Sequence, residues 1–256
     1  MNAKGTRGAR TSGFTLVELL VVLAVIGILA AILVPVLSGA KAKTQHVVCL
    51  NNLKQLTLAW LLYVDDHEDF LPPNDAGGHE GSYPGSWVVG NAQTDVNTTN
   101  IEQGVIFPYV SNAEIYRCPA DKSTVTDHPG LRRYRSYSMN GYLARPGYDL
   151  QRYSEIRVPG TDSVFVFIDE DQESIEDGIF GLWRAPGTWW INMPADRHRR
   201  MGSLSFADGH VSKIRWRWPK KFLFVDQDAE GPEDLADLRS LQELVPASTD
   251  ESGSNQ

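Results

Sequence analysis

Residues 14–37 read FTLVELLVVLAVIGILAAILVPVL, and this stretch decides the architecture of the chain. Its single charged residue is Glu18. As an α-helix, these 24 residues would rise about 36 Å, whereas the hydrocarbon core of a bilayer is roughly 30 Å thick. We therefore expect a membrane-spanning helix at residues 14–37. The preceding residues 1–13 contain Lys4, Arg7 and Arg10 and no acid, and such basic flanks stay on the cytoplasmic side.

Two simple interpretations of this segment leave something unexplained. A secretory signal peptide has an apolar core of roughly 7–15 residues, so the apolar run is too long, although Ala40-Lys41-Ala42 would fit its cleavage site. A plain membrane anchor fits the length but not Glu18, because a carboxylate in a membrane helix costs a few kcal/mol and usually has a function.

The segment Gly13-Phe14-Thr15-Leu16-Val17-Glu18 resembles the cleavage and methylation signature of type IV prepilins and type II secretion pseudopilins. The resemblance implies that a prepilin peptidase cuts after Gly13 and that the new N-terminus, Phe14, is methylated. It also implies that Glu18 pairs with the Phe14 amine of a neighbouring subunit, since opposite charges in a low-dielectric bundle offset each other's desolvation. Pro35 lies where this family often kinks the helix, because proline lacks a backbone donor.

The same resemblance implies a structural subunit and not an enzyme. Its partners would be other pilin or pseudopilin subunits in a homo-oligomeric filament, the prepilin peptidase and the inner membrane. The head would lie in the periplasm, and the filament would be periplasmic or on the cell surface. A type IV pilus and a type II secretion pseudopilus share the signature, so both remain open. With a net charge of −8 and no basic stripe, nucleic acid is not an expected partner.

Residues 38–66 predict an amphipathic continuation of the helix. Apolar residues recur there at spacings of three and four: Val47, Leu50, Leu53, Leu56, Trp60, Leu61 and Val64. The combined helix would have roughly 50 residues and a length of about 75–80 Å. Two helices, broken near Ser38 and Gly39, are the alternative.

Residues 67–245 are expected to form a globular, β-rich head, and the polar residues 246–256 a disordered tail. A strand is predicted over residues 162–169, and a hairpin over residues 202–218 with a type I′ turn at Asp208-Gly209. Residues 231–245 predict a short helix. The fold class is therefore α+β and pilin-like, with the long helix packed on an antiparallel sheet.

The two cysteines, Cys49 and Cys118, are too few for a disulfide scaffold. If the head lies outside the cytoplasm, one bridge between them would pin the head to the helix and add roughly 4 kcal/mol. Two buried free thiols are the alternative.

The tract CLNNLKQL at residues 49–56 also resembles a large group of prepilin-like proteins from planctomycete and verrucomicrobial-type genomes. That group tends to carry a histidine, nine residues and then Asp-Gly, a spacing that His198, Asp208 and Gly209 match.

Two clusters in the head could carry chemistry. His198, Asp208 and His210 could bind a metal or form a base with its carboxylate, which would suit a membrane-anchored or secreted hydrolase or carbohydrate-binding protein. The alternative is structural, with His198 holding the Asp208-Gly209 turn. An acidic loop could bind Ca²⁺ or simply be solvated, and its candidate ligands are Asp169, Asp171 and Glu173, next to Glu170, Glu176 and Asp177. No cofactor other than this possible Ca²⁺ is expected.

Aromatic and basic residues alternate in two places of the head. They are Trp183, Trp189 and Trp190 with Arg184, and Trp216, Arg217 and Trp218 with Lys220 and Lys221. These clusters could stack on sugars, as in an adhesin-like minor pilin, or form core and cation–π packing.

Overall fold

The computed structural model describes residues 15–147 and 150–247 of the chain. The chain divides into two compact units, Met1–Ala42 and Lys43–Gln256, which are described separately below. The predicted leader at residues 1–13 and most of the predicted tail at residues 246–256 lie outside the described residues.

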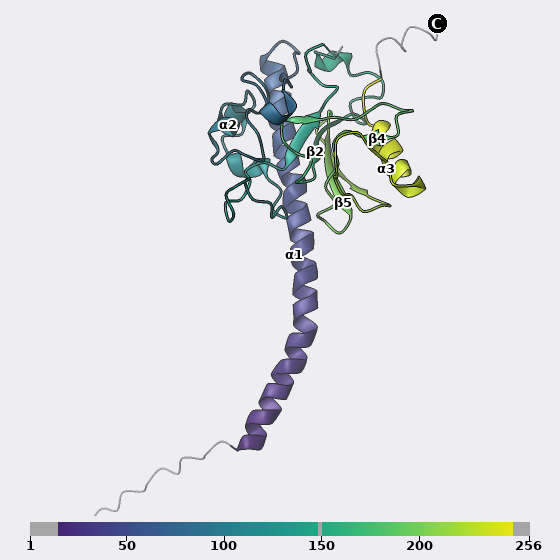
Figure 1. Cartoon of the computed structure of the whole chain (residues 1–256). Helices are drawn as coiled ribbons and strands as arrows, with labels where there is room; N and C mark the ends of the chain where they lie inside the picture. Colours follow the sequence, from purple (N-terminus) through teal and green to yellow (C-terminus); the bar gives the residue numbers. More distant parts are fainter. Residues whose placement is uncertain (1–14, 148–149, 248–256) are drawn as a thin grey trace, which may run out of the picture. The chain divides into compact units, whose positions relative to one another are not determined.

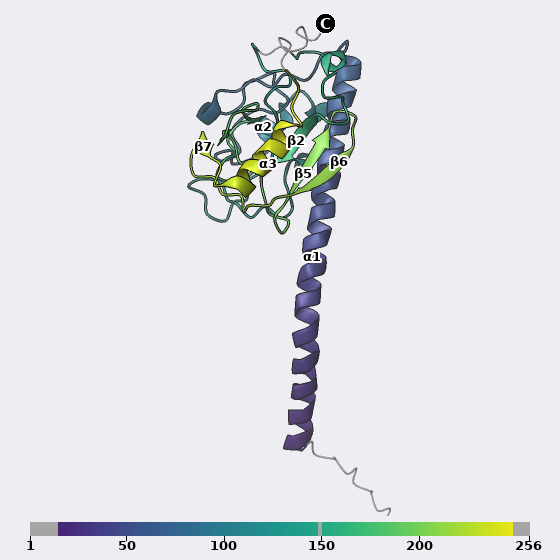
Figure 2. The same cartoon turned by 90° about the vertical axis from the view of Figure 1, so that its right-hand side faces the viewer.

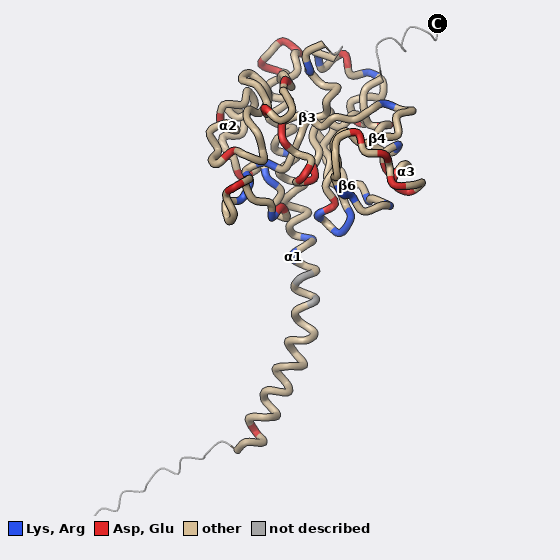
Figure 3. The backbone as a smooth tube through the Cα atoms, viewed as in Figure 1, with Lys and Arg blue, Asp and Glu red and all other residues tan. Residues whose placement is uncertain are grey.

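Helix α1 (Leu16–Asp66) begins in the first unit and ends in the second (Figure 1). Between residues 16 and 37 it consists almost entirely of Leu, Val, Ile and Ala, and Glu18 is the one acid in this range. Figure 3 shows red, the colour of acids, near the start of α1. The helix is continuous through Ser38 and Gly39, so the alternative of two helices is wrong. Pro35 lies within the helical range, but its side chain is outside the described part, so the predicted kink stays a prediction.

The second unit contains a five-stranded sheet with the order β3-β1-β2-β5-β6. Its strands are β1 (Tyr137–Asn140), β2 (Phe165–Asp169), β3 (Ile179–Phe180), β5 (Met201–Phe206) and β6 (Val211–Arg215). The neighbouring strands are antiparallel except β1 and β3, which are parallel, so the purely antiparallel sheet expected from the sequence is corrected to a mixed one. Strands β4 (Trp189–Trp190) and β7 (Gln227–Asp228) form a separate antiparallel pair.

The other helices described in the second unit are short, and most of them precede β1. Besides α3 (Pro232–Gln242), which confirms the predicted C-terminal helix, they are α2 (Thr99–Glu102) and the 3₁₀ segments Gly78–Glu80, Phe107–Tyr109, Ala113–Tyr116 and Tyr153–Glu155. Helix α3 has Pro232 in its first turn together with Glu233 and Asp234, where proline is tolerated and acids favour the helix dipole.

Two apolar cores lie on opposite faces of the sheet. One contains the buried face of α1, including Leu53, Leu56 and Trp60, and the other contains Leu238 and Leu241 of α3. Strand β2 contributes to both: Val166 and Phe167 to the first core, Phe165 and Ile168 to the second. A register shift between Phe165 and Ile168 explains why two consecutive residues share a face. In Figures 1 and 2, β2 and β5 lie between residues 43–66 of α1 and helix α3.

The hairpin of β5 and β6 has a different turn from the predicted one. The Gly209 amide donates to the Phe206 carbonyl oxygen at 2.8 Å, and the Phe206 amide donates to the His210 carbonyl oxygen at 2.9 Å. Gly209 has a φ of 90°, whereas Asp208 does not have a positive φ, which a type I′ turn requires. The connection is therefore a three-residue loop that ends on a left-handed glycine.

Candidate functional site

Helix α1 begins with a capping box. The backbone amide and the hydroxyl of Thr15 donate to Oε2 of Glu18 at 2.9 and 2.7 Å, and the Glu18 amide lies 3.3 Å from the Thr15 hydroxyl oxygen. Such reciprocal bonds satisfy donors that a helix N-terminus leaves without partners. Glu18 thus has a local role in a single chain. Gly13 and Phe14, the predicted processing residues, lie outside the described residues.

The first unit presents an apolar surface. The large apolar side chains of α1 from Leu16 to Leu37 are between 45% and 77% exposed. Soluble monomers rarely expose a continuous apolar surface of this extent, so it marks contact with a membrane or with other protein chains. Within the described residues, α1 is the helix long and apolar enough to cross a membrane, although signal sequences satisfy the same criterion.

The candidate triplet His198, Asp208 and His210 is not assembled. His210 and Asp208 pair at the exposed hairpin, with Nδ1 and Oδ1 2.7 Å apart. His198 is buried, and its Nε2 lies 3.2 Å from the sulfur of Cys118. The Gly209 carbonyl oxygen accepts a hydrogen bond from Lys54 of α1. Accordingly, the proposed role of His198 in holding the turn is not seen either.

The three predicted calcium ligands are not gathered at one point in the described chain. Asp169 is fully buried at the end of β2, where Arg197 donates to its Oδ1. Asp171 instead accepts from the Glu173 amide at 2.9 Å, and Glu173 is exposed. The neighbouring Glu170 is buried, and burial raises its pKa to about 8, so its carboxyl group is protonated near pH 7.

Cys49 and Cys118 are both buried and free. The predicted disulfide is therefore not formed in this structure, although the two residues meet as the prediction requires. Their sulfur atoms form a compact group with one carboxylate oxygen of Asp169 and one ring nitrogen of His198, and these four atoms lie within 4.8 Å of one another. Burial, with the nearby His46 and Arg197, lowers the pKa of His198 to about 4, so its imidazole is neutral.

This four-residue group was not predicted from the sequence as a unit. Cys49, Cys118, Asp169 and His198 were each singled out, but in three separate hypotheses. The sequence did contain a signal for a metal site, because cysteine, histidine and aspartate are the residue types that bind soft or borderline metals. The 148 residues between Cys49 and His198 hide their proximity until the sheet is formed.

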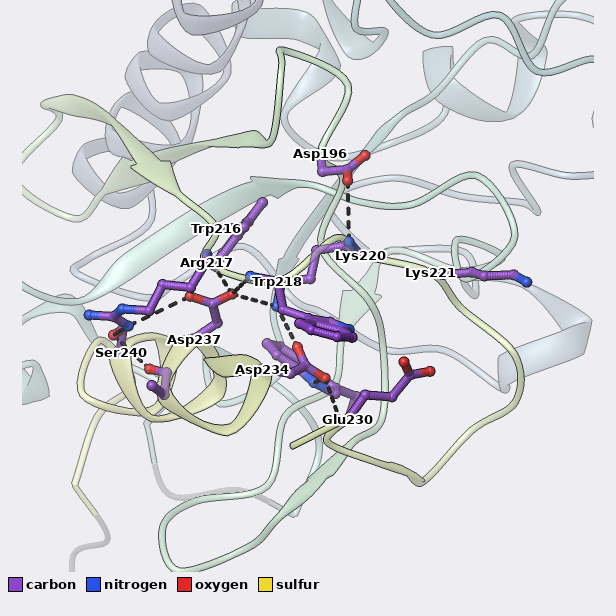
Figure 4. A network of polar contacts seen from close by, with 12 residues as sticks. Asp196, Trp216, Arg217, Trp218, Lys220, Lys221, Glu230, Asp234, Asp237 and Ser240 are labelled. Atoms are coloured by element: carbon purple, nitrogen blue, oxygen red, sulfur yellow. Dashed lines mark hydrogen bonds and ion pairs between the residues drawn. The ribbon is translucent and has the colours of Figure 1, made fainter. Parts of the chain in front are cut away.

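The two aromatic and basic clusters are partly buried and partly exposed. Trp190 and Trp216 are buried, and the ammonium of Lys220 lies 4.9 and 5.2 Å from the centres of their rings, so this part is core packing. Figure 4 shows Lys220 and Trp216 within this part of the head. Trp183 and Trp189 are 47% and 45% exposed. Trp183 also lines a cavity of about 430 Å³ together with Glu176 and Asp177.

Comparisons with known proteins match the N-terminal part of the chain. Residues 8–34 match the family described as the prokaryotic N-terminal methylation motif. A stretch of 76 residues, 30% of this chain, is 34% identical to the type II secretion system core protein G of Pectobacterium carotovorum subsp. carotovorum. The match spans about half, 48%, of that relative. The comparison with solved structures found no significant match. The chain therefore carries the N-terminal signature of type IV pilin-like and pseudopilin proteins.

Proposed function

We propose that this chain, which carries the prepilin-type methylation motif, is a structural subunit of a type IV pilus-like or type II secretion pseudopilus filament and not an enzyme. One observation carries the proposal: the motif at residues 8–34 includes most of the exposed apolar surface of α1. The similarity to a core protein of type II secretion supports it. A hydrolase using His198, Asp208 and His210 is disfavoured, because His198 lies apart from the other two.

The chemistry of the proposed assembly depends on two adjacent groups. Cleavage after Gly13 would create a free amine on Phe14, and methylation would leave that amine basic. In the single chain, the hydrogen bonds that Glu18 accepts from Thr15 fall on Oε2. A carboxylate has two oxygens, each with two lone pairs, so Oε1 can accept from the Phe14 amine of a neighbouring subunit while the cap stays in place. The charge pair would fix the axial register of the stack.

The apolar surface of α1 would serve two successive environments. Before assembly, residues 14–37 would anchor the subunit in the inner membrane, with the basic residues 1–13 in the cytoplasm and the head in the periplasm. After assembly, the same side chains would pack against α1 helices of other subunits. Both environments remove apolar side chains from water, and this is why one surface can serve both.

Intact-mass analysis of the protein from its native membrane tests the proposal. We expect a species that begins at N-methyl-Phe14. The Gly13→Ala variant should keep the leader, whereas the matched Gly27→Ala control should be trimmed normally, because a Cβ at Gly27 has no neighbour within 4 Å. A mature chain that begins at Met1, or near Thr44 after signal peptidase, would overturn the proposal.

A further inference from the structure

Four buried side chains from four separate segments of the head converge on one point. Cys49 comes from α1, Cys118 follows the 3₁₀ segment Ala113–Tyr116, Asp169 ends β2, and His198 precedes β5. Their four ligand atoms lie within 4.8 Å of one another, and all four residues are buried. We propose that these residues bind one Zn²⁺ ion as a structural centre of the head. This inference does not depend on the proposed function.

The distances between the ligand atoms fit tetrahedral zinc. Cys118 Sγ is 3.2 Å from His198 Nε2, and Asp169 Oδ2 is 3.8 Å from both Cys49 Sγ and His198 Nε2. Zinc binds sulfur at about 2.3 Å and nitrogen or oxygen at about 2.0–2.2 Å. At the tetrahedral angle, bonds of these lengths separate the ligand atoms by roughly 3.3–3.8 Å. These three separations therefore lie close to those of an occupied site.

The geometry at His198 argues against a catalytic triad. In a Cys-His-Asp triad, the sulfur faces one ring nitrogen and the carboxylate holds the other. Here the Cys118 sulfur and the Asp169 carboxylate both face the same nitrogen, Nε2. Two groups that face one nitrogen are placed to share an ion with it. Both cysteines are also 0% exposed, which leaves a nucleophile no route to a substrate.

Surrounding groups orient the ligands. Arg197 binds Oδ1 of Asp169, which leaves Oδ2 directed to the cluster, and a second guanidinium nitrogen lies 3.4 Å from Asp121. The hydroxyls of Tyr137 and Ser203 lie 3.3 and 3.4 Å from the Cys49 sulfur, where both can donate to a thiolate. Outer partners of this kind are what metal ligands need to keep their orientation.

The charge of the proposed centre is balanced within the protein interior. Two thiolates and one carboxylate around Zn²⁺ carry a net charge of −1, and the buried carboxylate of Asp121 adds another −1. The guanidinium groups of Arg197 and Arg133, which both interact with Asp121, add +2. Buried charges are tolerated when they are paired and hydrogen-bonded. Four protein ligands also fill the tetrahedron, as in structural rather than catalytic zinc sites. The ion would therefore join helix α1 to the sheet and to two connecting segments.

Metal analysis of the full-length chain purified in detergent tests the inference. We expect about one zinc per chain by elemental analysis and native mass spectrometry. Cys118→Ser and His198→Ala should each lower the zinc content at least about tenfold, since both remove a ligand. His210→Ala is the matched control for His198→Ala, because it makes the same change at the exposed hairpin, and Asp208→Asn alters a carboxylate outside the group. Both controls should retain the zinc.

A second measurement uses the wild-type protein, so it tests the inference even if the ligand variants fail to fold. Wild-type protein is depleted with a chelator and titrated with Co²⁺, which should give the absorption bands of tetrahedral cobalt bound to thiolate. Absence of these bands would overturn the inference. So would a wild-type chain that contains no zinc and has a mass lower by two hydrogen atoms, which would indicate a Cys49–Cys118 disulfide. Another metal in the site, or an unchanged zinc content in both ligand variants, would also contradict it.

Discussion

The ammonium nitrogen of Lys220 lies 2.5 Å from Oδ1 of Asp234, and neither side chain is more than 3% exposed (Figure 4). Asp237 adds a second carboxylate oxygen at 2.8 Å. The two aspartates belong to α3, so this buried ion group links that helix to the segment after β6. Asp237 also accepts hydrogen bonds from the backbone amides of Arg217 and Trp218 at 2.9–3.0 Å.

Replacing Lys220 should therefore destabilise the head strongly. Lys220→Met keeps most of the side-chain volume but leaves the buried Asp234 without its cation and Asp237 with only the exposed Arg217, 3.6 Å away. Removing one partner of a buried ion pair typically costs about 3–5 kcal/mol. Lys221→Met is the matched control, because Lys221 is exposed, and surface changes usually fall within about 0.5 kcal/mol. Denaturant unfolding of the full chain in detergent measures both. Equal unfolding midpoints for the two variants would contradict a stabilising role for the ion group.

Features set by residues close together in the sequence could be predicted from it, whereas features set by contacts between distant residues could not. The strand at residues 162–169, the hairpin and the C-terminal helix follow from local periodicity and turn residues, and the structure contains all three. The type I′ turn was wrong because the conformation of Asp208 depends on one extra loop residue, which the Asp-Gly pair does not reveal. Core and cation–π packing around Lys220 was one of two alternatives, because a basic residue between aromatics fits a binding surface as well as a core, and the structure shows the packing.

The same limit on prediction from the sequence applies to the candidate functional sites. The N-terminal signature is a continuous stretch, so it can be recognised from the sequence alone. The group of Cys49, Cys118, Asp169 and His198 exists only after four distant segments have packed together. Spacing therefore suggested the wrong partners for His198, because Asp208 and His210, which follow it by ten and twelve residues, pair with each other at the exposed hairpin.

Two leucines of α1 provide a paired test of how the helix packs in the head. Leu53 is 0% exposed in the core, whereas Leu58 is 45% exposed. Leu53→Ala should lower the free energy of unfolding by about 2–5 kcal/mol through lost burial and the cavity left behind. Leu58→Ala should change it by less than about 0.5 kcal/mol. Denaturant unfolding distinguishes the two, and a large loss for Leu58→Ala with none for Leu53→Ala would mean that the helix packs through its other face.

Glu18 has two separable roles, the local cap and the proposed pairing with Phe14 of another subunit. Glu18→Gln separates them, because glutamine also suits this position of a capping box but carries no charge. Glu18→Ala removes both the charge and the cap, and loss of a cap costs about 1 kcal/mol. If pairing with the amine controls assembly, both variants should be trimmed and methylated normally.

The amount of assembled filament then distinguishes the two roles of Glu18. An amide cannot neutralise an ammonium group in a low-dielectric bundle, so Glu18→Gln should reduce the assembled fraction at least about tenfold, corresponding to about 1.4 kcal/mol per subunit contact. Electron microscopy and the sheared surface or periplasmic fraction measure assembly, and intact mass verifies processing. If Glu18→Gln assembles like the wild type while Glu18→Ala does not, Glu18 acts through the helix cap, and another contact must set the register of the filament.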